Sequence, residues 1–454
     1  MKLRRMTAVF ASKLTAKICR MLGKQGVTWA GKIALMIDPA ILSELAGDVR
    51  EKIFVVCGTN GKTTTNNLLC STLEAQNKKV VCNHTGSNML NGAVAAFVLA
   101  AGWNGKLDAD YACIEVDEAS ALRIFPHFKP DFCVLTNLFR DQLDRYGEID
   151  ITMNLVRDAM KMAPDMKVIV NADDALSTYV TMESGNPYVT YGIQEKVFEE
   201  SINEIKEGRF CKKCGAKMNY HFYHFSQLGD YYCSNCDFKR PDIKYNASHI
   251  ETGKHLAFDV EGRHIEANYR GFYNVYNILA VYAAAREAGL EITNFVEVLK
   301  QYNPENGRNE HFSINGTEII LNLAKNPAGF NQNISAVMED TSEKDLIILI
   351  NDNDQDGTDV SWLWDVDFDR FQADNINSIM VSGIRCQDMR LRLKYVDIPS
   401  SLEPDVEKAI RNRVEHGCKN LYVLVNYTGL YSTHNILKKI EAEYADKQGL
   451  RILR

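Results

Sequence analysis

The sequence feature that most constrains the fold is an apolar strand that runs into a glycine-rich loop and then into a helix. The strand IFVVC occupies residues 53–57, and the loop GTNGKTTT occupies residues 58–65. In this setting the backbone N–H groups at the helix start face an anion, so the loop predicts phosphate binding. The Lys62 ammonium is expected to reach the β- and γ-phosphates during catalysis, and the Thr63 hydroxyl to ligate Mg²⁺. The predicted nucleotide contacts in the loop are Gly58, Thr59, Asn60, Gly61, Lys62, Thr63 and Thr64.

Short apolar runs separated by helical stretches surround this loop and predict an α/β fold. Buried strands of this kind form a mostly parallel, doubly wound sheet. The expected strands are 53–57, 79–82, 111–116, 132–137 and 167–174. Short aromatic strands, glycine turns and cysteines between about residues 189 and 269 predict an inserted β module, and a helix is expected over 274–289.

A second alternation of strands and helices follows a polar linker at residues 301–310 and predicts a Rossmann-like C-terminal α/β domain. Its expected strands are 318–324, 345–351, 378–383 and 421–426, and its helices lie near 327–339, 404–416 and 431–445. The predicted sections are a basic helical segment (1–50), a central nucleotide-binding domain (51–305) with a β-rich zinc ribbon inserted at 205–240, and the C-terminal domain (311–454).

Composition excludes several classes of protein. With 46% hydrophobic and 24% charged residues, this chain of 454 residues is neither disordered nor fibrous. Its net charge of -7 disfavours nucleic acid as a partner, because basic surfaces dominate that kind of affinity. Twelve cysteines in a long chain without a recognisable signal peptide favour a reducing cytosol.

The N-terminal segment is basic and carries apolar residues at helical spacing, but its apolar runs are too short for a signal peptide or a membrane span. Packing of the apolar face against its own domain is the more common arrangement for such a helix. Contact with anionic lipid headgroups is the alternative. The basic residues available for that contact are Lys2, Arg4, Arg5, Lys13, Lys17, Arg20 and Lys24.

Four cysteines have the spacing of a structural zinc site. The pairs Cys211-x2-Cys214 and Cys233-x2-Cys236 are separated by 18 residues, which is the pattern of a four-cysteine zinc ribbon. Four thiolates leave no open position for a catalytic water, so Zn²⁺ is expected to stiffen the insertion. The other eight cysteines lie mostly in apolar runs and are expected in the core.

An acidic segment at residues 349–369 follows a predicted strand of the last domain. Its aspartates are spaced partly like those of a calcium loop, but Leu363 occupies position 12, where such loops carry Glu. Trp362 and Trp364 are expected to be buried, which a solvated loop would not explain. On spacing alone, a functional segment and a solvated acidic loop both remain open.

Several motifs together resemble those of the Mur ligases and folylpolyglutamate synthases, which join a carboxylate to an amine through an acyl phosphate. The resemblance implies ATP and Mg²⁺, with Glu115 as a Mg²⁺ ligand, Asn277 at the adenine and Arg308 approaching the nucleotide from the hinge. Gln142 replaces the His that helps to hold a second Mg²⁺ in most Mur ligases. The motifs are GTNGKTTT (58–65), IEVDEAS (114–120), TNLFRDQLDRYGE (136–148), NADD (171–174), GFYNVYNILAVYAA (271–284) and GRNE (307–310).

Only about 50 residues precede the phosphate loop, so the N-terminal domain that grips UDP in Mur ligases is not expected. With the four-cysteine insertion and the segment DGTDVSWLWD (356–365), this pattern resembles the MurT family, the synthetase subunits of lipid II isoglutaminyl synthase. The resemblance implies ATP-dependent amidation of the D-glutamate α-carboxyl of lipid II to D-isoglutamine, for peptidoglycan synthesis at the cytoplasmic face of the plasma membrane. Ammonia would come from a glutaminase partner, GatD, whose Cys-His pair is completed by an aspartate of this chain, with Asp359 favoured over Asp356.

Two other functions are open at this stage. A folylpolyglutamate synthase-like ligase would add an amino acid to its substrate and would need neither a partner nor a zinc ribbon. A nucleic-acid-binding protein would use the ribbon, whose basic and aromatic residues suit stacking on bases. The acidic net charge and the intact GKT loop weigh against nucleic acid.

Overall fold

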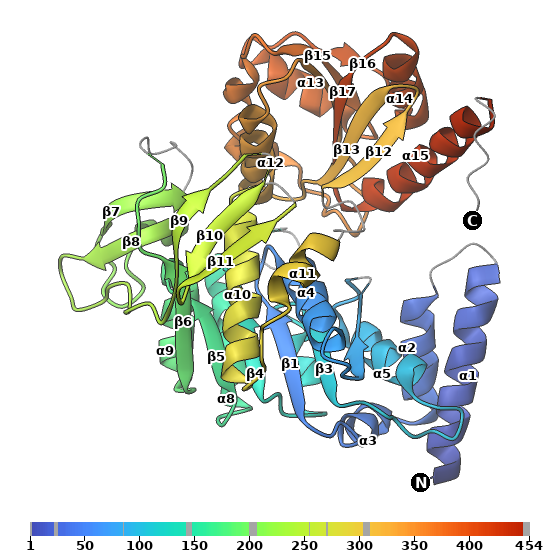
Figure 1. Cartoon of the computed structure of the whole chain (residues 1–454), viewed down its shortest axis with the longest axis vertical. Helices are drawn as coiled ribbons and strands as arrows, with labels where there is room; N and C mark the ends of the chain where they lie inside the picture. The colour runs from blue at the N-terminus through green and yellow to red at the C-terminus, as the bar shows by residue number, and fades with distance from the viewer. Residues whose placement is uncertain are drawn as a thin grey trace.

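Two α/β units make up the molecule, with the C-terminal unit (orange to red) above the larger one in Figure 1. The computed structural model describes residues 2–21, 26–84, 86–141, 148–198, 207–253, 255–268, 271–302 and 309–447. The first strand of the C-terminal unit begins at Glu310. The predicted domain boundaries stay predictions.

A nine-stranded sheet forms the centre of the larger unit, in the order β11-β10-β9-β6-β5-β4-β1-β3-β2. The strands from β2 to β9 in this order pair in parallel, and the last two pairings at the other edge are antiparallel. This confirms the predicted α/β fold. The bounds are β1 (Lys52–Cys57), β2 (Val80–Cys82), β3 (Tyr111–Glu115), β4 (Phe132–Leu135), β5 (Lys167–Asn171), β6 (Tyr188–Ile193), β9 (Tyr245–Glu251), β10 (Leu256–Val260) and β11 (Arg263–Ala267).

Helices cover both faces of this sheet, because alternate side chains of each strand point to opposite sides. Phe54 and Val56 of β1 enter the core on one face, and Val55 enters the core on the other. The first face is covered by α4 (Lys62–Glu74), α10 (Tyr273–Glu287) and α11 (Phe295–Gln301). The second is covered by α3 (Ile41–Ala46), α5 (Leu90–Ala100), α6 (Ala121–Ile124), α8 (Ile149–Lys161) and α9 (Ala175–Ser184).

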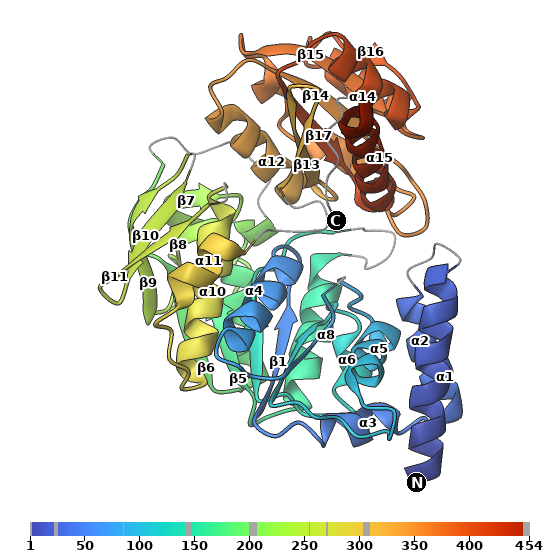
Figure 2. The ribbon, with the colours of Figure 1, turned by 45° about the vertical axis from the view of Figure 1, so that its right-hand side comes forward.

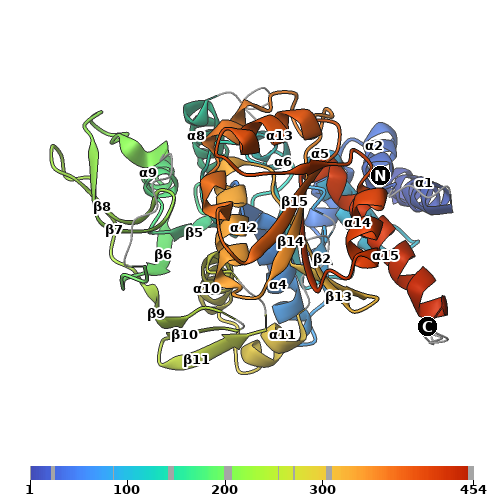
Figure 3. The ribbon, with the colours of Figure 1, turned by 90° about the horizontal axis from the view of Figure 1, so that it is seen from above.

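The inserted β module contains fewer strands than the sequence predicted. Strands β6, β9, β10 and β11 extend the main sheet, and only β7 (Met218–Phe225) and β8 (Leu228–Cys233) form a separate hairpin. Buried aspartates of the NADD motif attach this hairpin to the sheet. Gln227 Nε2 donates to Asp174 at 2.9 Å, and Arg240 Nη1 donates to Asp173 at 3.0 Å. Viewed from above, the hairpin projects at one side of the molecule (Figure 3).

The N-terminal helices α1 (Lys2–Met21) and α2 (Val27–Ile37) lie on the opposite side from the hairpin (Figure 3). They pack against α5 and against each other, and Ala8, Val9 and Ala16 of α1 are buried. A Cβ on Gly31 would lie 1.8 Å from the Asn91 carbonyl oxygen, so α2 approaches α5 closely only because this residue is glycine. The N-terminal segment therefore packs on its own domain, as predicted, but the large apolar side chains of α1 stay exposed, so the expected burial of its apolar face is wrong. In the described ranges, every helix is too short or too polar to cross a bilayer.

The C-terminal unit contains a six-stranded sheet in the order β12-β13-β17-β14-β15-β16, in which only β12 is antiparallel to its neighbour. Helices α12 (Pro327–Glu339) and α13 (Cys386–Lys394) pack on one face, and α14 (Val406–Glu415) and α15 (Tyr427–Lys447) pack on the other. The strands are β12 (Glu310–Ile314), β13 (Thr317–Leu323), β14 (Lys344–Leu349), β15 (Ile376–Ser382), β16 (Ser401–Leu402) and β17 (Asn420–Val425). Figure 2 shows this unit above the carboxyl ends of the central strands.

Candidate active site

A cavity of about 620 Å³ lies between the two units, at the carboxyl ends of β1, β3 and β4. This is the edge at which open α/β sheets commonly bind ligands. The larger unit contributes the phosphate loop and Glu115 to the walls, and the C-terminal unit contributes Lys325, Thr428 and His434. The cavity therefore brings together segments that are far apart in the sequence.

Two glycines let the phosphate loop turn tightly against its neighbours. Gly58 has φ +121, and a Cβ there would lie 2.4 Å from Thr136 Oγ1. Gly61 has φ +85, and a Cβ there would lie 2.2 Å from Asn277 Oδ1. Gly61 is the N-cap of α4 and no side chain caps this helix, so its first turn, which lines the cavity, suits an anion such as phosphate.

Thr136 and Asn137, which begin the motif at residues 136–148, hold the phosphate loop through hydrogen bonds to Asn60. Asn60 N donates to Asn137 Oδ1 at 2.9 Å, and Asn137 Nδ2 donates back to the Asn60 carbonyl at 3.1 Å. Thr136 Oγ1 donates to the same carbonyl at 2.8 Å. Phe139 N donates to Thr59 Oγ1 at 3.0 Å. These bonds fix the conformation of the loop at the edge of the cavity.

Lys62 is buried, and acidic side chains surround its ammonium. Its Nζ donates to the Gly58 carbonyl at 2.5 Å and to Glu118 Oε2 at 3.3 Å. Burial lowers the pKa of Lys62, but the charges of Glu118, Asp117 and Glu115 outweigh this effect and raise it. Lys62 is therefore cationic and held in place beside the loop. Sequence reasoning missed Glu118, although it belongs to the acidic motif IEVDEAS.

The two predicted Mg²⁺ ligands lie side by side. Thr63 Oγ1 donates to Glu115 Oε2 at 2.7 Å, and Asn88 Nδ2 donates to Glu115 Oε1 at 2.9 Å. Asn83 Oδ1 accepts from Glu115 N at 2.8 Å, which holds the end of β3 in position. A hydroxyl and a carboxylate at one point suit Mg²⁺, which prefers oxygen ligands and keeps several waters. These residues therefore fit the ion.

Asn277 lies against the phosphate loop. Its Oδ1 accepts from Thr65 Oγ1 at 3.4 Å, and its Nδ2 donates to Asn274 Oδ1 at 3.0 Å. It also lines the cavity, and its predicted contact with adenine stays a prediction. Arg308 and Gln142 lie outside the described residues.

Polar contacts join the two units next to the loop, and no local pattern in the sequence indicates them. Asn326 Nδ2 donates to Asn60 Oδ1 at 3.2 Å, while Asn326 Oδ1 caps α12 by accepting from Gly329 N at 2.8 Å. Lys325 forms an ion pair with Asp141. These contacts place the start of α12 against the phosphate loop.

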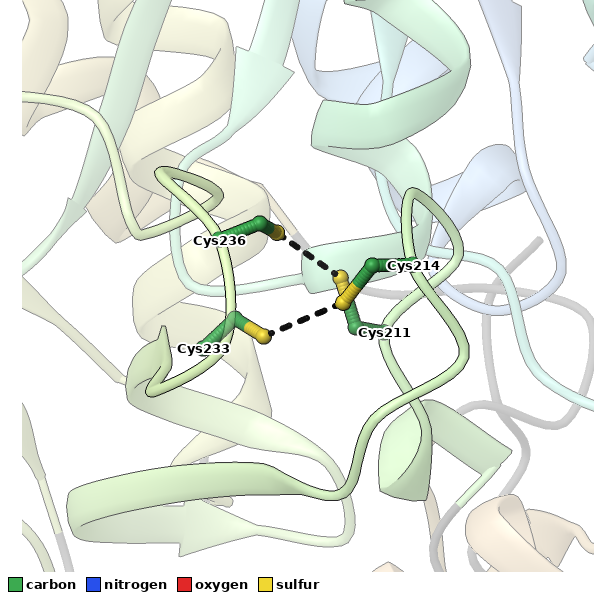
Figure 4. A group of neighbouring side chains, drawn as sticks. All are labelled: Cys211, Cys214, Cys233 and Cys236. Carbon is green, nitrogen blue, oxygen red and sulfur yellow. Dashed lines mark hydrogen bonds between the residues drawn. The ribbon is translucent and has the colours of Figure 1, made fainter.

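The four predicted zinc ligands converge in the structure (Figure 4). Cys211 Sγ lies 3.6 Å from Cys236 Sγ, and Cys214 Sγ lies 3.5 Å from Cys233 Sγ. A Zn²⁺ ion with bonds of about 2.3 Å requires sulfur–sulfur separations of about 3.8 Å, whereas a disulfide requires about 2 Å. The four thiols therefore fit a zinc ion.

Local interactions favour the thiolate form of Cys214, and two aromatic side chains form a small core beside the cysteines. Hydrogen bonds from Asn235 and from the Ala216 backbone lower the pKa of Cys214 to about 6. Tyr231 and Phe238 are buried beside the cysteines, with ring centroids 5.6 Å apart. These aromatic side chains pack inward, which supports a structural ribbon rather than a surface for stacking on bases.

The acidic segment differs from the sequence expectation at one tryptophan. Trp364 is half exposed, so its predicted burial is wrong, while Trp362 is partly buried against Phe330. Asp356 is only 6% exposed, and its oxygens accept from Thr428 N and Thr428 Oγ1. Asp359 is exposed at the start of a short 3-10 helix, Ser361–Asp365.

Comparison with known proteins agrees with this geometry. The Mur ligase middle-domain family matches residues 56–285, and the MurT ligase C-terminal family matches residues 323–430. A "Lipid II isoglutaminyl synthase (glutamine-hydrolyzing) subunit MurT" from Staphylococcus aureus (strain COL) is 36% identical over 431 residues, covering 94% of this chain and 96% of the relative. The chain belongs to the MurT family.

A MurT subunit from Streptococcus pneumoniae (strain ATCC BAA-255 / R6) is 32% identical, covering 96% of this chain and 98% of the relative. A solved pseudomurein peptide ligase type C from Methanothermus fervidus has a TM-score of 0.67 at 21% identity, covering 87% of this chain and 80% of that one. This likeness shows the Mur ligase fold. Membership of the Mur ligase families implies ATP and Mg²⁺, which agrees with the phosphate loop and the Thr63–Glu115 pair.

We predict that Glu115→Gln in this MurT-family chain raises the Mg²⁺ concentration needed for half-maximal activity by at least about tenfold, because a neutral amide replaces a charged oxygen ligand. Mg²⁺ titration of ATP turnover measures this effect. Glu74→Gln, an exposed glutamate at the end of α4, is the control and should titrate like the wild type. An unchanged Mg²⁺ titration for Glu115→Gln would exclude Glu115 from the metal site.

We further predict about one zinc ion per chain by elemental analysis, lost in Cys233→Ser but kept in Cys418→Ser, whose thiol is far from the ribbon in sequence. Removal of zinc by a chelator should expose residues 207–240 to hydrogen exchange while the main sheet stays protected. A chain that contains no zinc as purified, and whose ribbon is equally protected with and without chelator, would contradict the zinc site.

Proposed function

We propose that this chain is the synthetase subunit of a lipid II isoglutaminyl synthase. It activates the α-carboxylate of the D-glutamate residue of lipid II with ATP, and ammonia then displaces phosphate to give D-isoglutamine. A carboxylate is a poor electrophile, and conversion to an acyl phosphate supplies a leaving group. The γ-phosphate develops negative charge during transfer, and the Lys62 ammonium and a cation held by Thr63 and Glu115 would neutralise it.

The observation that carries this proposal is the shared cavity between the two units. Its walls include Lys62, Thr63 and Glu115 on one side and Gln355 of the acidic segment on the other. Asp356 follows Gln355 directly along the chain, and Asp359 lies three residues further on. The acidic segment thus connects the cavity wall to the protein surface, which is the arrangement needed if ammonia is produced by a second subunit.

The two candidate aspartates differ in whether a partner subunit could contact their side chains, because Asp356 is buried and Asp359 is exposed. Both oxygens of Asp356 are used by Thr428 at the start of α15, and the side chain is buried. Asp359 accepts from Ser361 N at 2.8 Å and from Ser361 Oγ at 2.9 Å, and it remains exposed. These bonds lower the pKa of Asp359, so it carries a negative charge at neutral pH. We therefore propose Asp359, and not Asp356, as the carboxylate that orients the partner's catalytic His.

Exposed aromatic side chains support a partner surface near Asp359. Trp364 and Tyr395 are both at least half exposed and stack edge to face, with ring centroids 5.0 Å apart. The Arg392 guanidinium lies 5.5 Å from the centre of the Trp364 ring. Arg392 is buried beneath this pair, and the exposed part of the cluster is aromatic, a side-chain class enriched at protein interfaces. The relatives' name calls them subunits, and we propose that the partner here is a glutaminase of the GatD type.

The proposed substrate also indicates where in the cell the reaction takes place. Lipid II carries its stem peptide on a membrane lipid, so we propose that the chain works in the cytoplasm at the inner face of the plasma membrane. Zn²⁺ at the four-cysteine site has a structural part in this proposal, because four thiolates leave no position for substrate.

We predict that Asp359→Asn lowers glutamine-dependent amidation by about 10²- to 10⁴-fold, because an amide no longer fixes the tautomer of a partner His or stabilises its imidazolium. Amidation from added ammonium salt should stay at the wild-type rate, because Asp359 is not one of the residues that line the cavity at the phosphate loop. Both rates are measured with purified lipid II, ATP and the glutaminase subunit.

Asp354→Asn is the matched control, since Asp354 is an exposed aspartate in the same segment. It should leave both rates unchanged. Loss of both activities in Asp359→Asn, with partner binding intact, would instead place Asp359 in the synthetase site. Full glutamine-dependent activity would remove Asp359 from the partner's site.

A further inference from the structure

The N-terminal helix α1 exposes a continuous apolar stripe. Six large apolar side chains follow one another at intervals of three or four residues, which places them on one face of the helix. Their exposed fractions range from 39% to 78%. At about 1.5 Å per residue the stripe is about 27 Å long. Its residues are Leu3, Met6, Phe10, Leu14, Ile18 and Met21.

The fold leaves most of this stripe exposed, although Met6 and Phe10 also contact the loop at residues 103–105. The side of α1 that contacts the rest of the chain carries small residues, and Ala8, Ser12 and Ala16 on it are fully or almost fully buried. Arg4 Nε donates to the Ile37 carbonyl at 2.6 Å, and Arg5 pairs with Asp48, so both fix the helix from its packed side. An amphipathic helix that packs mainly by its small-residue side leaves most of its large apolar side for another contact.

Positive charge accompanies the stripe. Helix α1 contains six Lys or Arg residues and no Asp or Glu, in a chain whose net charge is -7. By helical periodicity, Lys13, Lys17 and Arg20 lie along one edge of the stripe. Long basic side chains at the edge of an apolar face can reach anionic headgroups while the apolar face is inserted.

A loop next to α1 extends the same surface. Trp103 is 61% exposed, and its ring centroid lies 5.8 Å from that of Phe10. Lys13 Nζ lies 5.2 Å from the centre of the Trp103 ring. Tryptophan beside lysine is typical of side chains at the headgroup level of a bilayer, where one part meets hydrocarbon and another meets water.

We propose that α1 and Trp103 form a membrane-docking surface that binds bilayers containing anionic phospholipid. The apolar stripe lies in the interface between headgroups and acyl chains, and Lys13, Lys17 and Arg20 contact the anionic headgroups. A stripe without acidic residues suits a uniformly anionic bilayer better than a second copy of a chain whose exposed α1 is equally basic, because like charges would face each other. The benefit for catalysis rests on the proposed function, since lipid II is held in such a bilayer.

Flotation of the full-length chain with lipid vesicles tests this proposal. Wild type should float with vesicles of phosphatidylglycerol and phosphatidylcholine in equal parts, and much less with phosphatidylcholine alone. Added salt should weaken the binding, because it screens the headgroup charge. Leu14→Glu should lower the bound fraction at least about tenfold, because a carboxylate replaces an inserted apolar side chain beside anionic lipid.

Leu391→Glu is the matched control, because Leu391 is a helical leucine of the other unit that is 49% exposed, against 45% for Leu14. It should float like the wild type, and thermal melting should show that both variants remain folded. Equal flotation of Leu14→Glu and wild type, or no flotation of the wild type, would overturn the proposal. A wild-type dimer that becomes monomeric in Leu14→Glu by sedimentation would assign the stripe to a contact between copies and would also overturn it.

Amidation assays separate this proposal from the proposed function. Leu14→Glu should amidate detergent-dispersed lipid II at the wild-type rate but should be several-fold slower on lipid II in anionic vesicles. If the wild type amidates lipid II in neither form, the proposed function fails, while flotation still decides whether α1 binds bilayers. Equal rates for both proteins on vesicle-bound lipid II would contradict the docking role of α1.

Discussion

Burial of the Lys62 ammonium determines how the surroundings of the phosphate loop are built. A buried cation without a partner costs several kcal/mol, so its carboxylate partner must come from a neighbouring strand. Lys62 is the first residue of α4, after the phosphate loop that follows β1, and Glu118 lies in the turn that follows β3. The two meet because β1 pairs with β3 in the register Val56 to Glu115. The same register brings Glu115 to the Thr63 hydroxyl, so one strand pairing forms both the charge pair and the metal-ligating pair.

The second unit completes the site through the same loop. The backbone N–H of Asn60 donates to Asn137 of the larger unit, and the Asn60 side chain accepts from Asn326 of the C-terminal unit. Asn326 also caps α12, so the orientation of that helix is tied to the phosphate loop. Lys325 of the C-terminal unit forms an ion pair with Asp141, and its positive charge also partly offsets the rise in the pKa of Glu118 that burial causes. Both units therefore line the cavity. ATP would bind on the side of the larger unit, and ammonia would arrive from the side of the C-terminal unit.

The sequence predicted the elements whose signals are local. The helix expected near residues 327–339 is α12, whose start is capped by Asn326. The cysteine spacing predicted a cluster that the structure forms. The partners of β9, β10 and β11 could not be predicted, because an aromatic strand looks the same whether it joins the main sheet or a separate module.

Contacts between residues far apart in the chain also could not be predicted from the sequence. The pairing of Lys62 with Glu118 and of Lys325 with Asp141 requires the folded sheet order. The resemblance favoured Asp359 over Asp356, but the physical difference between them, the burial of Asp356 against Thr428, is seen only in the structure. The exposure of Trp364 has the same cause, since nothing local shows which side of a short helix is left uncovered.

Oxygen transfer from substrate to phosphate is the most direct test of the central claim that the chain activates a carboxylate by phosphorylation. The α-carboxylate of the D-glutamate residue of lipid II is labelled with ¹⁸O, and the inorganic phosphate released during amidation is examined by mass spectrometry. Attack of the carboxylate on the γ-phosphate predicts one ¹⁸O atom in each phosphate released for each amide formed. Amidation accompanied by unlabelled phosphate would contradict the account, because the carboxylate oxygen would then never have been bonded to phosphorus.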